Sequence, residues 1–193
     1  MAGTELIAVD DSVLCVIDVQ RWFVDRLPAE TGQVLVARIA WLCRVAGALS
    51  VPVVVTEEEP EDNGSTAVEI VAALPPETPI FTKPVFGLAA VPEIVAAVEE
   101  HGRGTVVLVG METDVCIAHS ALGLIDRGRR VAVVRDAVAS PGLDHEYGLE
   151  RMRDAGAVLL GAKGLYYEWV RTVDGSPALK ALAEPPAATA LAL

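Results

Sequence analysis

The sequence predicts a doubly wound α/β sandwich, in which helices cover both faces of a parallel sheet. Short runs rich in valine and isoleucine recur along the chain, and most are apolar at nearly every position. This is typical of strands that are buried on both faces of a parallel sheet. Longer amphipathic stretches separate the runs, as helices do in right-handed βαβ crossovers. The length of 193 residues suits a single domain.

Six runs have the composition of buried strands: Val13–Asp18, Val51–Thr56, Pro79–Thr82, Thr105–Gly110, Arg130–Arg135 and Ala157–Leu160. Helices are expected near residues 31–49, 65–74, 91–101, 115–128, 144–155 and 163–172. Ser65 resembles a cap of the second helix, and Asp144 and Gly156 resemble the caps of the fifth. We expect one domain over residues 1–183. The Ala/Pro-rich tail over 184–193 is either mobile or bound to a neighbouring subunit.

The charge of the chain argues against two classes of partner. Fifteen basic and 27 acidic residues give a net charge of −12. Such a surface repels phosphate backbones and anionic lipids, so we expect no nucleic acid and no membrane as partner. The longest stretch without charge, Val45–Thr56, is much shorter than the ~20 residues that cross a bilayer. The first residues lack a secretory signal and the three cysteines are too few for a disulfide framework, which favours the cytoplasm.

Side chains of complementary chemistry follow three of the predicted strands. Asp18 ends the first strand, Lys83 follows the third, and Cys116 lies in the segment G-M-E-T-D-V-C after the fourth. Ligands bind beyond the carboxyl ends of the strands in folds of this kind. We therefore expect a carboxylate, an amine and a thiol to share one rim of the sheet, although Asp18 and Lys83 taken singly could be surface residues.

The position of Cys116 at the start of a predicted helix suggests a reactive thiol. Free backbone N–H groups and the helix dipole there favour an anion, so the pKa of the thiol is predicted to fall. The alternative, a small buried apolar residue, is equally compatible with the position. Burial of Asp18 and a nearby Lys83 have opposite effects on the carboxyl pKa, a balance that suits proton exchange near neutral pH.

Cofactor motifs do not occur in the chain. No G-x-G-x-x-G follows the opening strand and no G-x-x-x-x-G-K-[ST] is found, so we expect no nucleotide cofactor. The three histidines, His101, His119 and His145, are not spaced for a shared metal site. The sequence therefore predicts a site that works on a small molecule without a metal or a cofactor.

These residues resemble the isochorismatase-like cysteine hydrolases from about Val13 to Thr172. That family has a first strand ending in D-x-Q-x-x-F, a lysine followed by an aromatic residue, and G-x-x-T-D-x-C before a helix. The matching positions here are Asp18, Gln20, Phe23, Lys83, Phe86 and Gly110–Cys116.

The resemblance implies a six-stranded parallel sheet of order 3-2-1-4-5-6, Rossmann-like, with Asp18, Lys83 and Cys116 as a catalytic triad. It also implies a cis peptide between Met111 and Glu112, with the N–H groups of Glu112 and Cys116 facing one oxyanion. Cys116 would then attack a small amide or N-carbamoyl compound, and the resulting thioester would be hydrolysed. The resemblance implies a homo-oligomer as well, either a dimer or a tetramer.

Six residues are candidate substrate contacts: Gln20, Trp22, Phe23, Glu57, Phe86 and His119. Simpler interpretations stay open, since Trp22 could pack against another subunit, Glu57 could be solvated and His119 could be a surface residue. The loop at 56–60 has no histidine, unlike the metal-binding loop of nicotinamidases, which argues against that activity. Hydrolysis of an ester or vinyl ether, or a catalytically silent binding or assembly protein, are the alternative functions.

Overall fold

Six parallel strands form one sheet in a computed structural model that describes residues 5–172, 182 and 185–193. The order is β3-β2-β1-β4-β5-β6, which confirms the predicted fold class. The strands are β1 (Ser12–Ile17), β2 (Val53–Glu58), β3 (Ile80–Lys83), β4 (Thr105–Met111), β5 (Arg130–Ala139) and β6 (Val158–Leu160).

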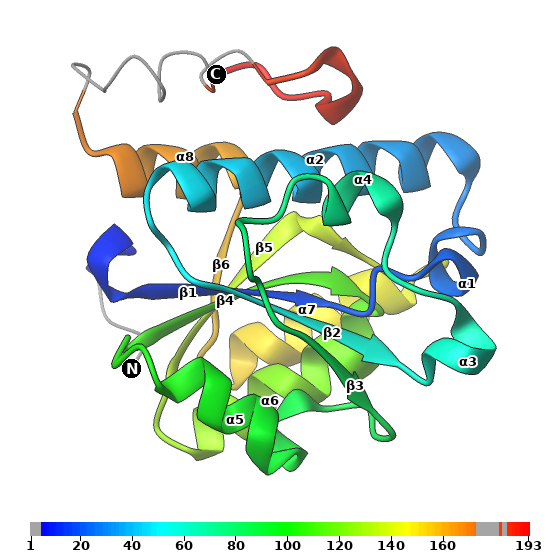
Figure 1. The fold of residues 1–193 in the computed structure, drawn as a ribbon, viewed down its shortest axis with the longest axis horizontal. Helices are drawn as coiled ribbons and strands as arrows, with labels where there is room; N and C mark the ends of the chain where they lie inside the picture. Colours follow the sequence, from blue (N-terminus) through cyan, green and yellow to red (C-terminus); the bar gives the residue numbers. More distant parts are fainter. Residues whose placement is uncertain (1–4, 173–181, 183–184) are drawn as a thin grey trace.

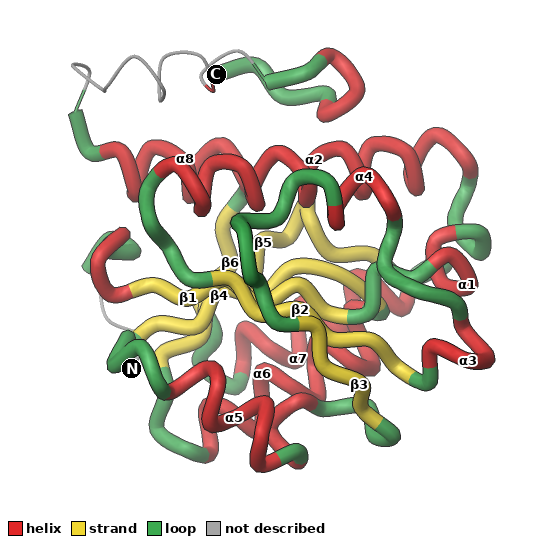
Figure 2. The backbone as a smooth tube through the Cα atoms, in the orientation of Figure 1, coloured by secondary structure: helices red, strands yellow, loops and turns green. Residues whose placement is uncertain are grey.

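Helices cover both faces of the sheet, which gives three layers (Figures 1 and 2). One layer holds α2 (Ala29–Ala48), α4 (Val68–Val71) and α8 (Ala162–Val170). The other holds α5 (Pro92–Glu99), α6 (Ala118–Asp126) and α7 (Asp144–Asp154). Short elements connect them: α1 (Arg21–Val24), α3 (Pro60–Asn63), the 3-10 turns η1 (Val9–Asp11), η2 (Leu88–Ala90) and η4 (Ala187–Thr189), and the π-helical turn η3 (Thr113–Ile117).

The central strand β1 shows why the chain folds into layers. Leu14 and Val16 belong to the apolar core under α2, whereas Val13, Cys15 and Ile17 belong to the core under α5 and α6. Successive side chains of a strand point to opposite faces, so a fully apolar run stabilises only a strand that is covered on both sides. The carboxyl ends of β1 and β4, which pair side by side, therefore open onto one edge of the molecule.

Some local predictions differ from the structure. The helix expected over 65–74 is a single turn, α4, capped by Ala67 and not by Ser65. Here the chain preceding α4 is extended, because Thr66 forms an antiparallel bridge with Gln20 and the Ala67 N–H donates to the carbonyl of Val19. Leu143, not Asp144, is the N-cap of α7, whereas Gly156 follows its C-cap with the expected positive φ of 101°.

The described end of the chain lies along α2 of the same chain (Figure 1). Thr189 is buried, and its carbonyl accepts hydrogen bonds from the Arg38 guanidinium at 2.8 and 3.1 Å. The predicted boundary between residues 183 and 184 lies outside the described residues. Among the helices of the described part, none combines the length and the apolar character needed to cross a bilayer.

Candidate active site

Four neighbouring strands each bring one chemically active side chain to the carboxyl edge of the sheet. Lys83 is the last residue of β3, Glu58 is the last residue of β2, and Asp18 directly follows β1. Cys116 lies in the turn η3, which follows β4. Since β3, β2, β1 and β4 are consecutive in the sheet, these four side chains converge although their segments are distant in the sequence. We call them the edge cluster.

Asp18 and Lys83 form a buried ion pair in the edge cluster. The Lys83 Nζ lies 2.5 Å from Oδ2 of Asp18, and both side chains are fully buried. The hydroxyl of Thr56 donates to Oδ1 of Asp18 at 2.8 Å, and the ammonium also donates to the carbonyl of Val85 at 2.9 Å. Burial raises the pKa of Asp18 to about 6, although Lys83 lowers it. The carboxyl group therefore titrates close to neutral pH, as the opposing effects suggested.

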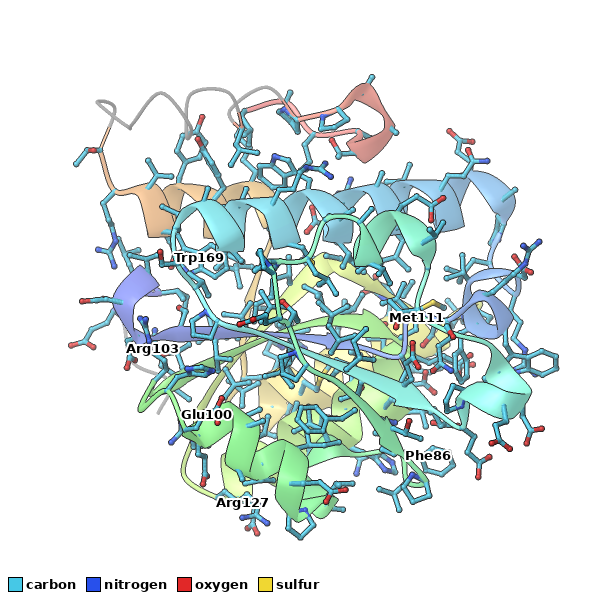
Figure 3. The ribbon with its side chains drawn as sticks, in the orientation of Figure 1. Phe86, Glu100, Arg103, Met111, Arg127 and Trp169 are labelled. Atoms are coloured by element: carbon cyan, nitrogen blue, oxygen red, sulfur yellow. The ribbon has the colours of Figure 1, made fainter. Side chains whose placement is uncertain are left out.

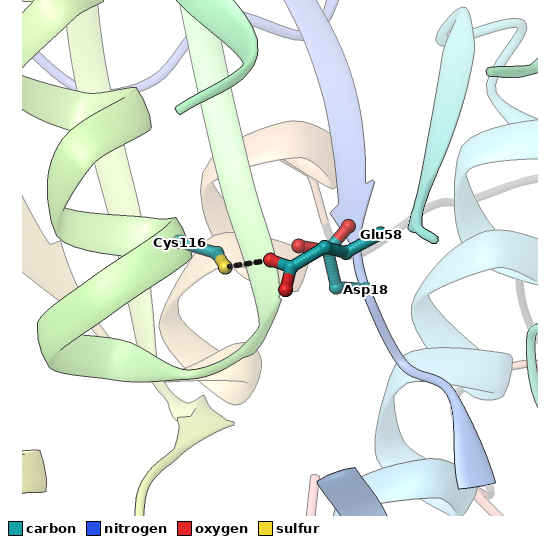
Figure 4. A group of neighbouring side chains, drawn as sticks. All are labelled: Asp18, Glu58 and Cys116. Carbon is teal, nitrogen blue, oxygen red and sulfur yellow. Dashed lines mark hydrogen bonds between the residues drawn. The ribbon is translucent and has the colours of Figure 1, made fainter. Parts of the chain in front are cut away.

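The Cys116 sulfur lies against two carboxylates. Its thiol donates a hydrogen bond to Oε2 of Glu58 at 3.2 Å (Figure 4). The sulfur, one oxygen of Glu58 and one oxygen of Asp18 all lie within 4.8 Å of one another. Cys116 is only 2% exposed, whereas the side chain of Glu58 beside it is 15% exposed.

The predicted fall in the pKa of the Cys116 thiol is wrong. Burial raises its pKa well above the ordinary value, and the charge of Asp18 raises it further, against the opposing effect of Lys83. Cys116 also precedes α6, in the π-helical turn, and is not in the first turn of a regular helix. The resting thiol is therefore protonated, and its reaction requires a neighbouring base.

The turn that carries Cys116 is fixed from several sides. The hydroxyl of Ser120 donates to the carbonyl of Cys116 at 2.6 Å, and the Thr113 hydroxyl lies 2.9 Å from Nδ1 of His145 on α7. The peptide between Met111 and Glu112 is cis, as the resemblance implies. A side chain at Gly110 would place its Cβ 1.9 Å from the carbonyl oxygen of Ile17, so only glycine allows β4 to end so close to β1.

Three of the candidate substrate contacts have partners within the chain, and their contact with a substrate stays a prediction. The Gln20 amide donates to the carbonyls of Glu58 and Gly64 at 2.8 and 2.6 Å, and accepts from the Glu58 N–H at 2.7 Å. Glu57 accepts hydrogen bonds from the N–H and hydroxyl of Thr66 at 2.6 and 2.8 Å. Phe23 packs in the apolar core. The hydrogen bonds of Gln20 and Glu57 therefore hold the end of β2 in place.

The other three candidates lie at the surface. Trp22 and Phe86 are each half exposed, and the Arg26 guanidinium lies 4.5 Å from the centre of the Trp22 ring. The rings of Phe86 and His119 meet edge to face at 5.8 Å, and Figure 3 shows Phe86 on the outer side of the loop after β3. Both line a cleft of about 660 Å³, whose described lining does not include Cys116. Their contact with a substrate stays a prediction.

Glu58 was not among the predicted site residues, because the second strand was expected to end at Thr56. The strand continues to Glu58, and its side chains alternate between the two faces. Thr56 and Glu58 therefore face the edge cluster, whereas Glu57 faces Thr66. Because every second side chain of a strand lies on the same face, extending the strand by two residues beyond Thr56 would have identified Glu58.

The edge cluster suits an ammonium better than a metal ion. The ligand atoms of Asp18, Glu58 and Cys116 are close enough to share an ion. However, the Lys83 ammonium lies 2.5 Å from Asp18 and 3.5 Å from Glu58, so a cation already occupies this position. A second cation in the same space would be repelled by the first.

Comparisons with known proteins agree with this architecture. The family described as "Isochorismatase domain" matches residues 12–163. The bovine "Isochorismatase domain-containing protein 2" is 37% identical over 139 residues, which cover 70% of this chain and 65% of that protein, less than two thirds of its length.

Solved structures are similar over almost the whole chain. The MAR1 ribonuclease of Caenorhabditis elegans has a TM-score of 0.85 and 28% identity, and the match covers 98% of each chain. The YcaC gene product of Escherichia coli, described as an octameric hydrolase of unknown specificity, has a TM-score of 0.85 and 24% identity over 94% of this chain and 91% of that chain. With the family match over residues 12–163, this chain belongs to the isochorismatase family and has its hydrolase fold.

Proposed function

We propose that this protein is a cysteine hydrolase that cleaves the C–N bond of a small amide or N-carbamoyl compound through a thioester. One observation carries the proposal: the buried Asp18–Lys83 ion pair, 2.5 Å long, lies beside the thiol of Cys116, which has charged neighbours of both signs. A buried ion pair is weak support for stability, because desolvation offsets most of its attraction. Its position next to a nucleophile points to chemistry.

The reaction would proceed as follows. The Cys116 sulfur attacks the carbonyl carbon while a carboxylate takes the thiol proton, and Asp18 is the acceptor implied by the family resemblance. Lys83 holds Asp18 in its charged form. The backbone N–H groups of Glu112 and Cys116 would donate to the oxygen that becomes negatively charged. The C–N bond then breaks, the amine leaves with the proton, and water hydrolyses the thioester to the acid and the free thiol.

Other functions fit less well. Hydrolysis of an ester or a vinyl ether stays the alternative within enzymes, and a silent binding or assembly protein would not need the buried charges. A fold neighbour is named a ribonuclease. A polyanionic substrate is disfavoured for this protein, because the net charge of −12 and the carboxylates of the edge cluster would repel it.

The assembly and the compartment are part of the same proposal. The octameric state of the Escherichia coli neighbour supports a homo-oligomer. Half-exposed Trp22 and Phe86 would suit contacts between copies. The three cysteines are free thiols, which suits the reducing cytoplasm.

A panel of small amides, N-carbamoyl compounds and esters would test the activity, with ammonia or acid release as the measurement. We expect the wild type and Cys15→Ala to hydrolyse an amide, and Cys116→Ala and Asp18→Asn to lose the activity. Mass spectrometry of quenched reactions should find the acyl group on the peptide that carries Cys116. Amide hydrolysis by Cys116→Ala would exclude the thioester route, and ester cleavage alone by that variant would favour the alternative.

A further inference from the structure

We propose that Glu58 is a second catalytic carboxylate of the edge cluster, which takes the Cys116 proton in place of Asp18, passes it to the leaving amine and later accepts a proton from water. This inference rests on the proposed function, since it assigns a role within the same reaction. It follows from the contacts, the exposure and the fixed position of Glu58.

The contacts of the two carboxylates differ. Oδ1 of Asp18 accepts from the Thr56 hydroxyl, and Oδ2 is paired with the Lys83 ammonium at 2.5 Å. The thiol of Cys116 instead donates to Oε2 of Glu58 at 3.2 Å, within the range in which a general base can take a proton. The thiol also interacts with Asp18, but both oxygens of Asp18 already have Thr56 or Lys83 as a partner, whereas Oε2 of Glu58 directly accepts the thiol hydrogen bond.

The two carboxylates also differ in exposure, and this difference too favours Glu58 as the group that exchanges protons. The side chains of Asp18 and Lys83 are fully buried, whereas that of Glu58 is 15% exposed. The leaving amine must receive a proton and the hydrolytic water must lose one, and both enter or leave at the solvent side of the site. Both carboxylates interact with the Cys116 thiol, and of the two Glu58 is the one whose side chain is also partly exposed.

The position of Glu58 is fixed by its neighbours. The Gln20 amide holds both its N–H and its carbonyl, and the Asn63 side chain donates to the same carbonyl at 2.9 Å. Its register partner across the sheet is Lys83, whose ammonium lies 3.5 Å from Oε2. Two carboxylates thus share one ammonium, so the cluster can take up one further proton without creating a net positive charge.

The proton balance closes over the whole cycle. The sulfur–carbon bond forms as the thiol proton moves to Glu58, and the carbonyl electron pair moves to oxygen. The C–N bond breaks as Glu58 returns that proton to nitrogen. Water then attacks the thioester and gives a proton to Glu58, the C–S bond breaks, and the sulfur recovers the proton. The sum is amide plus water to acid plus amine.

The test compares Glu58→Gln with Glu59→Gln, which removes a charge from the next, exposed residue. Each variant and the wild type are given an amide and a p-nitrophenyl ester of the same acyl group, in single-turnover experiments. Glu58→Gln should slow the amide ~100-fold or more, and the ester at least ~10-fold less than the amide, because p-nitrophenolate leaves without a proton. Glu59→Gln should stay within about twofold of the wild type.

Two results would overturn the role of Glu58: a Glu58→Gln rate on the amide close to that of the wild type, or equal losses on amide and ester, which a structural role predicts. Glu58→Asp retains the carboxylate and should keep more amide activity than Glu58→Gln; equal activities also count against the proposal. Cys116→Ala separates the two levels. If it still hydrolyses the amide, the proposed function fails, whereas an inactive Cys116→Ala beside a fully active Glu58→Gln removes only the role of Glu58.

Discussion

The middle of the sheet and its carboxyl edge each bury a cysteine, in opposite surroundings. Cys15 lies in the middle of β1 among apolar side chains such as Val13 and Ile17, and burial alone raises its pKa to about 12. Cys116 is almost as buried, but its thiol touches Glu58 and lies near the charges of Asp18 and Lys83. Burial keeps both thiols protonated. Only the second has a neighbour that can take the proton.

The two regions also divide stability and chemistry along the same strands. Every residue of β1 and β4 is buried, and their apolar side chains stabilise the sheet. Asp18 follows Cys15 by only three residues, about 10 Å along an extended strand. Within that distance the chain changes from apolar packing to a buried ion pair whose desolvation the rest of the sheet must offset.

The largest expected effect separates the two cysteines. Cys116→Ala should reduce amide hydrolysis by a factor on the order of 10⁴ or more, because the nucleophile is removed. Cys15→Ala should keep the activity and lower the free energy of unfolding by about 1 kcal/mol, because it leaves a small cavity. Steady-state kinetics and urea unfolding of both variants make the comparison. Equal activity losses would mean that the cysteines at the edge and in the middle of the sheet do not differ in their chemical role.

The second effect concerns stability at the edge. Lys83→Met should lower the free energy of unfolding by ~3–5 kcal/mol, because it leaves the buried carboxylate of Asp18 without its counter-charge. The matched change Arg21→Met removes an exposed ion pair with Asp25 and should cost less than about 1 kcal/mol. Chemical unfolding at pH 7 measures both. A Lys83→Met protein as stable as Arg21→Met would show that the ion pair is not effectively buried.

The third effect is a pH dependence of opposite sign for stability and activity. Burial raises the pKa of Asp18 from 3.8 to about 6, so folding favours its protonated form. The stability that Asp18 contributes is fully present below about pH 4 and is lost as the pH rises through 6. Over that window, the difference in unfolding free energy between wild type and Asp18→Asn should fall by roughly 2–3 kcal/mol. A flat difference between pH 4 and 7 would contradict the raised pKa.

The activity should change in the other direction, since the ionised Asp18 is the form that pairs with Lys83. We expect kcat/KM for an amide to fall about tenfold per pH unit below pH 6. Neutral substrates are required for this measurement, so that the profile reports the enzyme. Activity that is unchanged down to pH 5 would argue that Asp18 does not need to be ionised.

How far the sequence predicts this molecule depends on the kind of signal. The apolar runs of β1 and β4 identify strands because burial on both faces requires apolar residues at every position. The prediction of a helix over residues 65–74 was wrong for most of its length. Thr66 pairs with Gln20 in an extended conformation, and this tertiary contact cannot be predicted from local helix signals. The described tail at 185–193, with little sequence information, packs on α2 through Arg38.

The candidate site follows the same division. Asp18, Lys83 and Cys116 could be predicted to lie together because Asp18 and Lys83 lie at strand ends and Cys116 lies in the turn that follows the fourth strand. The direction of the pKa shift of Cys116 could not be predicted, because it depends on burial and on the charge of Asp18. Neither can be read from the position of Cys116 at the start of a predicted helix. Identifying Glu58 required the correct end of the second strand, which extends two residues beyond the predicted end. Strand alternation then determines the face to which its side chain points. Errors of this size in strand ends are enough to exchange Glu57 for Glu58.

The smallest expected effect compares adjacent residues of α6. Ser120 is buried, accepts from the N–H of Leu88 at 3.0 Å and donates to the carbonyl of Cys116. Ser120→Ala should therefore lower the free energy of unfolding by ~1–3 kcal/mol and also reduce activity.

His119 is exposed and touches Phe86 beside a cleft whose described lining does not include the Cys116 sulfur. His119→Ala should therefore change kcat/KM less than about threefold, equivalent to ~0.65 kcal/mol. A large rise in KM with unchanged kcat would instead show that His119 contacts the substrate, and that the substrate site includes the outer cleft.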